Sequence, residues 1–305
     1  MRVFVTGATG FIVGEAARRL RARGDEVVAL VRDPARAQGL GYELVEGDLG
    51  DSGTIRRGLE GCDAAVHGAA VYQVGVSGKA AAAMREANVG GTERVLGAAL
   101  ELGTAKVVYV STVAVFGNTH GQVVDEASGP VSPPLAVYDE TKREAHQLAA
   151  GLIAAGLPCA IVQPGAVYGP GDPSQLGGTL RRVAAGRMPL IAFADCGLNA
   201  VHRDDVADGI LLALDRGRAG EAYVLGGELT TIGAMAATVA RLTGHRAPRS
   251  LPPSLLRAGA RLSPRLRDLV ASSDGVTYWA SDAKARNELG YAPRGLEEGL
   301  KETFA

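Results

Sequence analysis

Tyr138 and Lys142 are the pair whose residue types and spacing could do chemistry in this 305-residue chain. They stand four positions apart in the run YDETK (138–142), and a helix would place both side chains on one face. A phenol has an ordinary pKa of about 10, and a neighbouring cation favours the phenolate and brings that pKa closer to neutrality. Such a pair is suited to moving a proton to or from the oxygen of an alcohol or a carbonyl. The same spacing also occurs on solvated helix faces, so the rest of the chain must decide between these two interpretations.

A glycine-rich turn opens the chain. The apolar run Val3 to Val5 leads into TGATGFIVG (6–14), and Glu15 to Arg23 then has the pattern of an amphipathic helix. Between a strand and a helix, such a turn leaves backbone N–H groups free at the helix N-terminus, where a pyrophosphate can bind. A plain structural turn is the alternative. The residues expected to hold the nucleotide are Gly7, Thr9, Gly10, Phe11 and Ile12.

The second expected strand, Glu26 to Val31, bears on the choice of cofactor. A carboxylate at the end of this strand would bind the ribose 2′-hydroxyl of NAD, but Val31 stands there and Arg32 follows it. A guanidinium can pair with a 2′-phosphate, so the sequence favours NADP, while Asp33 keeps NAD possible. A solvated surface arginine is the alternative interpretation of Arg32.

Two more expected strands end in residues suited to contact with a cofactor. Tyr42 to Glu46 is followed by Asp48, whose carboxylate could accept a hydrogen bond from an adenine amine. Ala64 to His67 is followed by Ala69 and Ala70, small residues that let a cofactor approach the backbone. A histidine at such a strand end is more often structural than catalytic, so we assign His67 no chemistry.

A fifth expected strand, Lys106 to Val110, leads to a third catalytic candidate, Thr112. Ligands bind beyond the carboxyl ends of parallel strands, so the Thr112 hydroxyl and the Tyr138 phenol can face the same cofactor. Helices are expected over Ala80 to Leu102, with two glycines inside it, and over Tyr138 to Ala155. Glycines within a helix can mark close packing against a neighbour.

The alternation of strands and helices predicts an α/β fold with a doubly wound parallel sheet, the Rossmann arrangement. Cys159 to Gln163 is the sixth strand, so residues 1–163 are expected to form the dinucleotide-binding domain. The pattern then changes to the loop-like run PGAVYGPG (164–171). Residues 164–305 should form a smaller C-terminal substrate-binding region, partly interleaved with the main sheet. Its expected elements are a strand over Ala222 to Leu225 and helices over Asp204 to Leu214, Thr231 to Leu242 and Pro252 to Leu262.

Composition narrows the class of partner. The net charge is -1 and the pI is about 6.5, so no basic field for nucleic acid is expected. Three cysteines, Cys62, Cys159 and Cys196, without CxxC spacing, indicate neither a disulfide framework nor a metal site. The chain shows neither a cleavable leader nor an apolar run of about 18 residues, so we expect a cytoplasmic protein without a membrane partner.

Eight short motifs follow one another in an order typical of a known family. The chain resembles extended short-chain dehydrogenases/reductases of the NAD-dependent epimerase/dehydratase type over nearly its whole length, and most nearly their dihydroflavonol reductase-like and hopanoid-associated branch. The eight motifs are TGATGFIVG (6–14), GDL (47–49), VHGAA (66–70), NVGGT (88–92), VSTVAVFG (110–117), YDETK (138–142), PGAVYGPG (164–171) and HRDDVA (202–207).

This resemblance implies a nicotinamide-dependent oxidoreductase acting on a small molecule. By it Tyr138 is the acid–base residue, Lys142 binds the nicotinamide ribose and tunes Tyr138, and Thr112 holds the substrate oxygen. It also implies a homodimer formed through the two long helices. The remaining cofactor contacts implied by the resemblance are Leu49, Asn88, Pro164 and Val167.

One position departs from the family pattern. The third glycine of the turn is replaced by Val13, with a glycine displaced to Gly14. That glycine normally lets the helix pack close to the strand, so we expect a small shift of the first helix.

The run GLNAVH (197–202) bears on the substrate. Relatives that act on nucleotide sugars have an arginine five positions before the valine-aspartate-aspartate core of their motif, and Leu198 stands there in this chain. Leucine cannot bind a phosphate, so a ketone, aldehyde or secondary alcohol is favoured over a nucleotide sugar. Cations from a neighbouring helix could replace the missing arginine, and a sugar-nucleotide epimerase or dehydratase is the alternative. A non-catalytic dinucleotide sensor is a second one, which the presence of both Tyr138 and Lys142 disfavours. The replacement cations would be Arg181, Arg182 or Arg187.

Overall fold

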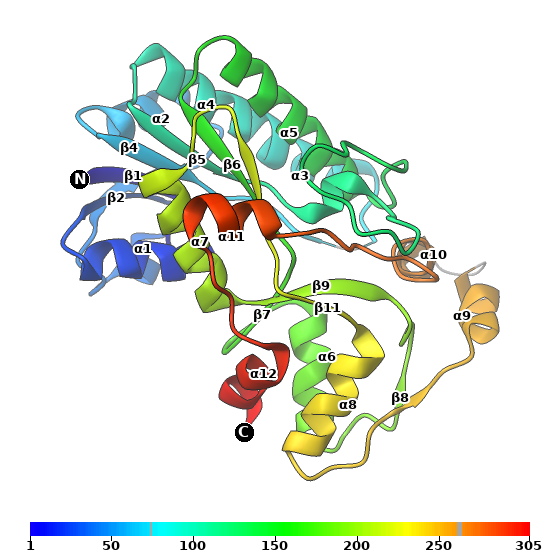
Figure 1. Cartoon of the computed structure of the whole chain (residues 1–305). Helices are drawn as coiled ribbons and strands as arrows, with labels where there is room; N and C mark the ends of the chain where they lie inside the picture. Colours follow the sequence, from blue (N-terminus) through cyan, green and yellow to red (C-terminus); the bar gives the residue numbers. More distant parts are fainter. Residues whose placement is uncertain (74, 261–263) are drawn as a thin grey trace.

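Within residues 1–73, 75–260 and 264–305, which the computed structural model describes, seven parallel strands form the large sheet (Figure 1). The strand order is β10-β6-β5-β4-β1-β2-β3, so the direction of winding reverses between β1 and β4. A ligand crevice is expected outside the carboxyl ends of the strands at such a reversal. The strands are β1 (Arg2–Thr6), β2 (Glu26–Val31), β3 (Glu43–Glu46), β4 (Ala64–His67), β5 (Lys106–Val110), β6 (Cys159–Pro164) and β10 (Ala222–Leu225).

Helices cover both faces of this sheet, which confirms the doubly wound fold (Figure 1). Both faces are therefore apolar, and alternate residues of one strand serve different layers: Val3 and Val5 face one, Phe4 the other. One layer contains α1 (Val13–Ala22), α7 (Arg203–Arg216) and α11 (Ala283–Leu289); the other contains α2 (Ser52–Leu59), α4 (Gly91–Glu101) and α5 (Val137–Ala154).

The long helix expected over residues 80–102 is divided into three parts. It consists of α3 (Gly78–Arg85), one wide π turn (Glu86–Gly90) and α4. A Cβ on Gly91 would lie 2.8 Å from the Leu49 side chain, so this glycine lets α4 pack against the turn after β3. Gly91 therefore marks close packing, as expected, and the π turn contains Asn88, whose side chain bonds Val71 and Thr141.

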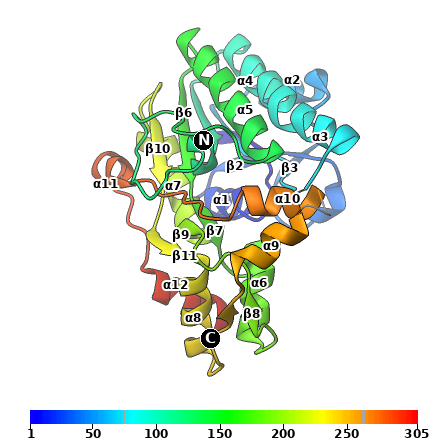
Figure 2. The same ribbon diagram turned by 90° about the vertical axis from the view of Figure 1, so that its right-hand side faces the viewer.

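A smaller lobe lies below the carboxyl edge of the sheet in Figure 1, and Figure 2 shows it turned by 90°. The loop expected over residues 164–171 contains a strand, because β7 pairs with β9 in a second sheet. Three elements after residue 163 return to the large sheet: β10 pairs with β6, α7 packs beside α1, and α11 packs against α7 and β10. The lobe contains β7 (Ala166–Tyr168), β8 (Leu190–Ile191), β9 (Gly197–His202), β11 (Glu228–Thr231), β12 (Arg249–Ser250), α6 (Gln175–Ala184), α8 (Ile232–Leu242), α9 (Pro253–Ala260), α10 (Pro264–Ala271) and α12 (Leu296–Phe304).

Some boundaries differ from the expected ones. The first helix begins at Val13 rather than Glu15, and α2 was not expected, although Asp51 caps its N-terminus. Of the helix expected over Pro252 to Leu262, the structure describes α9, while the expected end at Leu262 lies outside the described residues. Short helical turns cover Pro34–Ala37 and Val113–Phe116. None of the described helices is long and apolar enough to cross a membrane.

Candidate active site

A cleft of about 1290 Å³ runs along the carboxyl edge of the large sheet and continues into the smaller lobe. It is lined by residues from β1, β2, β5 and the segment after β4 on the sheet side, and from β9 and α8 on the lobe side. All the expected site residues except Asn88 line this cleft: Gly7, Thr9, Gly10, Phe11, Ile12, Arg32, Asp48, Leu49, Ala69, Ala70, Thr112, Tyr138, Lys142, Pro164 and Val167.

The glycine turn has the geometry of a phosphate-binding turn. Gly7 has a φ of +84°, and a Cβ there would lie 3.0 Å from the backbone nitrogen of Ala69. A Cβ on Gly10 would lie 3.1 Å from the Gly7 carbonyl oxygen. No side chain caps the start of α1, and the backbone N–H groups of Gly14 and Glu15 bond the carbonyls of Gly10 and Ile12 at the same turn. This end of the cleft fits a dinucleotide pyrophosphate.

Val13 is accommodated by a second glycine. A Cβ on Gly68, at the end of β4, would lie 2.3 Å from Cγ2 of Val13. The valine therefore occupies the space that a side chain at Gly68 would need. A small residue directly after β4 thus makes room for the Val13 side chain, and the expected shift of the first helix stays a prediction.

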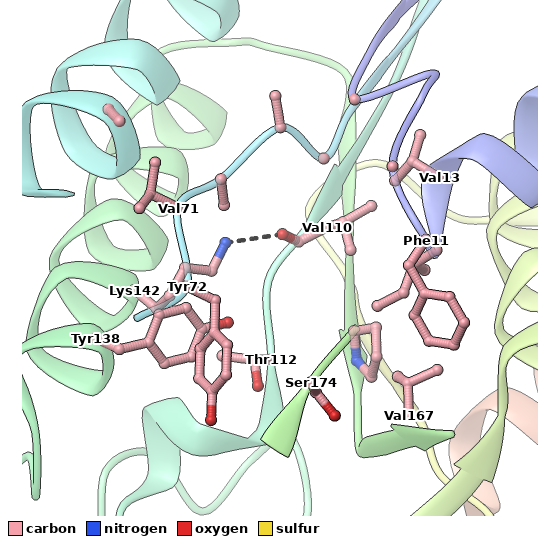
Figure 3. Close-up of a pocket in the computed structure, with 18 of the residues that line it drawn as sticks. Phe11, Val13, Val71, Tyr72, Val110, Thr112, Tyr138, Lys142, Val167 and Ser174 are labelled. Carbon is pink, nitrogen blue, oxygen red and sulfur yellow. Dashed lines mark hydrogen bonds between the residues drawn. The ribbon is translucent and has the colours of Figure 1, made fainter. Parts of the chain in front are cut away.

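Tyr138, Lys142 and Thr112 converge at the centre of the cleft (Figure 3). Tyr138 and Lys142 lie in the first two turns of α5, while Thr112 directly follows β5. The Lys142 ammonium donates a hydrogen bond to the Val110 carbonyl at 2.9 Å. Tyr72 packs edge-on against the Tyr138 ring, with centroids 4.7 Å apart. The strand end and the helix thus bring together the three residues expected to do chemistry.

Burial controls the protonation of Tyr138 and Lys142. It raises the pKa of Tyr138 above its usual range, and the Thr112 hydroxyl opposes this shift. Burial also lowers the pKa of Lys142 to about 7. The expected lowering of the Tyr138 pKa by Lys142 is not found, because desolvation dominates at Tyr138. At neutral pH the phenol is protonated and can donate a hydrogen bond or a proton.

Asn88 is the expected site residue that does not line the cleft. It is buried, its Oδ1 accepts from the Val71 N–H at 2.7 Å, and its Nδ2 donates to the Val71 carbonyl at 3.0 Å. Its amide also donates to the Thr141 hydroxyl. All of its polar atoms are thus used within the protein, and it supports the wall of the cleft through Val71.

Three arginines line the cleft near its adenosine end, and one of them, Arg94, bonds the Leu49 carbonyl and pairs with Glu86. Arg32 and Arg36 are the other two, and neither forms an ion pair with any residue in the described ranges. The Asp33 carboxylate accepts from the Ala35 N–H at 3.0 Å and caps the short helical turn that carries Arg36. The local sequence predicted that Arg32 contacts the cofactor. Arg36 was not predicted to do so, because it reaches the cleft only through the fold of the short helical turn that carries it.

Among the residues that the structure describes, the substrate end has no cation. The residues from 164 onward that line the cleft include neither lysine nor arginine, as far as the structure describes them. Arg181 donates to the carbonyl of Asp172, and Arg181, Arg182 and Arg187 lie outside the cleft. The Asp172 carboxylate is buried and accepts from the N–H and hydroxyl of Ser174. Sequence reasoning did not identify the side chains that form this end, which are Leu176, Cys196, Ile232, Ser272, Ser273 and Tyr278.

Known proteins resemble this chain along most of its length. It is 33% identical to a putative dihydroflavonol 4-reductase of Synechocystis sp. (strain ATCC 27184 / PCC 6803 / Kazusa), over 97% of this chain and 92% of that protein. It is also 33% identical to the 4-hydroxy-2-methyl-3-oxo-4-farnesyl-3,4-dihydroquinoline-1-oxide ketoreductase of Stigmatella aurantiaca, over 96% and 92% of the two chains.

Solved structures share the architecture. The dTDP-glucose 4,6-dehydratase DesIV of Streptomyces venezuelae, solved with NAD bound, superposes with a TM-score of 0.83 at 28% identity, covering 100% of this chain and 96% of that one. The model of the NAD dependent epimerase/dehydratase family matches residues 3–226. The chain therefore belongs to the NAD dependent epimerase/dehydratase family and is an NAD(P)-dependent oxidoreductase.

Proposed function

We propose that this enzyme is an NADP-dependent reductase or dehydrogenase that acts on an uncharged ketone, aldehyde or secondary alcohol. The observation that carries the proposal is a cleft in which Thr112, Tyr138 and Lys142 meet, next to a substrate end without any described cation. A nucleoside diphosphate would need cations there to neutralise its phosphates. The ketoreductase of Stigmatella aurantiaca is named for a farnesylated substrate, in keeping with an apolar site.

The meeting of Thr112, Tyr138 and Lys142 in one cleft supports the roles that we propose for them. A nicotinamide dinucleotide, when bound, supplies or accepts the hydride. Thr112 holds the substrate oxygen, and Tyr138 gives that oxygen a proton in reduction or takes one in oxidation. Lys142 is held by β5 and orients the ribose. The raised pKa of Tyr138 keeps its proton available at neutral pH, which favours the reducing direction.

The preference for NADP rests on Arg32 and Arg36. Both line the adenosine end and lack an ion-pair partner among the described residues, so they are available to a 2′-phosphate. The nearest carboxylate along the chain, Asp33, is engaged by a backbone N–H. Two free cations beside an occupied carboxylate favour NADP over NAD.

The direct test is turnover of NADPH with a panel of aryl and alkyl ketones and aldehydes, followed at 340 nm. We expect consumption of NADPH with apolar carbonyl compounds, and faster turnover with NADPH than with NADH. If none of the panel is reduced and none of the corresponding alcohols is oxidised, the proposal fails.

A sugar-nucleotide epimerase or dehydratase is the second candidate, favoured by the likeness to DesIV. Calorimetric titration with UDP, dTDP and their sugars separates the two. Micromolar binding that is lost in Arg181→Ala, Arg182→Ala or Arg187→Ala would establish this candidate instead.

A homodimer through the helices α4 and α5 stays a prediction from the family resemblance. These two helices pack against each other on one face of the sheet. Light scattering of the purified chain would give twice the mass of 31.3 kDa if the dimer forms.

A further inference from the structure

The Lys142 ammonium has two protein partners on β5, and one of them has no role in the proposed mechanism. It donates to the Val110 carbonyl at 2.9 Å and to the Tyr109 hydroxyl at 3.1 Å. Among the described residues no carboxylate pairs with it, and burial alone shifts its pKa. An ammonium has three N–H donors, so these two contacts leave one donor for the cleft.

Tyr109 is a fixed partner. Its side chain is buried, and its ring stacks on the His67 ring at a centroid distance of 5.6 Å and an interplanar angle of 17°. The Lys142 nitrogen lies 4.8 Å from the Tyr109 centroid, farther than from the hydroxyl oxygen. The hydrogen bond, rather than the ring face, is therefore the main contact.

Behind Tyr109, a series of hydrogen bonds runs from Thr92 through His67 to Thr6, where the glycine turn begins. The Thr92 hydroxyl donates to the Asn88 carbonyl at 2.6 Å, so it can only accept from Nε2 of His67, at 3.0 Å. Nδ1 of His67 then accepts from the Thr6 hydroxyl at 2.7 Å. That hydroxyl oxygen in turn accepts from the Ala69 N–H at 3.2 Å. With the Thr92 hydroxyl donating to Asn88, the ring proton of His67 lies on Nε2.

The Thr92 hydroxyl is also a side-chain hydrogen-bond partner of the Tyr109 phenol. Burial raises the pKa of Tyr109 above its usual range, and the Thr92 hydroxyl opposes this shift. A buried polar network whose members are all satisfied is rigid, because each bond restricts its neighbours. The network thus connects the turn that receives the phosphates with the ammonium at the catalytic centre.

We propose that Tyr109 is a positioning residue for Lys142, and that its hydroxyl, anchored through Thr92 and His67 to Thr6, directs the third N–H of the ammonium into the cleft. This inference rests on the role proposed for Lys142. It assigns a purpose to a tyrosine hydroxyl that the family motifs do not mention. In the absence of this hydroxyl the ammonium would keep one backbone acceptor and could rotate away from the cofactor.

The groups that face Lys142 allow a clear titration. Burial and the charge of Lys142 lower the pKa of His67, on β4, to about 3 and that of His146, on α5, to about 4. Burial raises the pKa values of Tyr109 and Tyr138. Between pH 5 and pH 9, Lys142 is therefore the group among these five that changes charge, while burial raises the pKa of Asp139, three residues before Lys142 on α5, to about 6.

The test follows the Lys142 side chain in the full-length protein labelled with ¹³C at lysine Cε. Lys142→Arg assigns its resonance. Tyr109→Phe removes one oxygen that accepts from the ammonium, so the charged form is less stable and the Lys142 pKa should fall by about one unit. Tyr168 is also a buried tyrosine, but it lies outside the cleft, so Tyr168→Phe should leave the Lys142 pKa unchanged. The lysines to be distinguished are Lys79, Lys106, Lys142, Lys284 and Lys301.

Kinetics supply a second readout. With a carbonyl compound that the wild type reduces, Tyr109→Phe should lower kcat about tenfold with little change in KM, and should move the alkaline limb of the profile to lower pH. Thr92→Val should also lower kcat and move the alkaline limb to lower pH, in both cases by less than Tyr109→Phe does. A Lys142 pKa and a kcat in Tyr109→Phe equal to those of Tyr168→Phe would overturn the inference.

The two proposals fail separately. If no carbonyl compound is reduced, the NMR titration still reports whether Tyr109 holds the ammonium. If reduction occurs but Tyr109→Phe titrates like the wild type, the proposed function stands and the positioning role is wrong.

Discussion

At the cofactor end of the cleft the backbone sets the shape, whereas at the substrate end side chains set it. Gly7, Gly10 and Gly68 each stand where a Cβ would meet an atom within about 3 Å, so one residue type fits. Leu176, Leu198 and Ile232 come from three separate elements and meet only in the folded lobe. The first arrangement restricts the sequence at fixed spacings, and the second requires only that the surface be apolar. Substitutions should therefore have large effects at the first end and graded effects at the second.

The largest expected effect is at the boundary between the two ends. Tyr138→Phe removes the proton donor and should lower kcat about a thousandfold, because general acid–base groups contribute about 10² to 10⁴ in rate. NADPH affinity, measured by fluorescence titration, should stay within about threefold of the wild type. A variant with undiminished turnover would remove Tyr138 from the mechanism, and a loss of cofactor binding would mean that the phenol belongs to the cofactor end.

The next effect concerns the cofactor end alone. Arg32→Ala and Arg36→Ala should each weaken NADPH binding about ten- to a hundredfold, because a charge-assisted contact contributes about 1.5 to 3 kcal/mol. NADH binding should be unchanged, since NADH lacks the 2′-phosphate. Arg187→Ala, which changes an arginine outside the cleft, is the matched control. Equal binding of NADH and NADPH by the wild type would contradict the assignment of both arginines.

A third variant tests whether close approach sets the shape of the cofactor end. Gly68→Ala places a methyl group against Val13 and should lower the free energy of unfolding by about 1 to 2 kcal/mol, as overpacking does. The double variant Gly68→Ala, Val13→Ala should recover most of this loss, which denaturant unfolding would measure. If the double variant is no more stable than Gly68→Ala, the contact between these two positions is not the constraint.

The same contrast explains what could be predicted from the sequence. The glycine turn, the strand ends and the pair Tyr138 and Lys142 have fixed local spacings. The parallel sheet was therefore predicted correctly, and the residues predicted to bind the cofactor, apart from Asn88, line one cleft. Asn88 was expected to touch the cofactor, but its partner Val71 depends on how a helix folds back. Arg36 was missed for a similar reason, since a short turn returns it to the cleft.

Pairing and burial account for the remaining differences. The strand β7 was expected to be a loop, because glycines and prolines surround it and its partner β9 lies far along the chain. The Tyr138 pKa was expected to fall beside a cation, and it rises because desolvation, which no spacing reveals, is the larger effect. What the sequence did not determine therefore depends on contacts between distant segments.

The smallest effect is expected at the substrate end, and it measures how tolerant that end is. Ile232 is half-buried at the start of α8 and lines the cleft, so Ile232→Ala removes apolar contact without leaving a polar group unpaired. That contact is shared by bound substrate and transition state, so KM for an apolar ketone should rise about three- to tenfold while kcat stays the same. Leu242→Ala, on the same helix but outside the cleft, should change neither value and controls for the loss of packing. A fall in kcat as large as that of Tyr138→Phe would show that the substrate end is as constrained as the cofactor end, and the contrast between them would be lost.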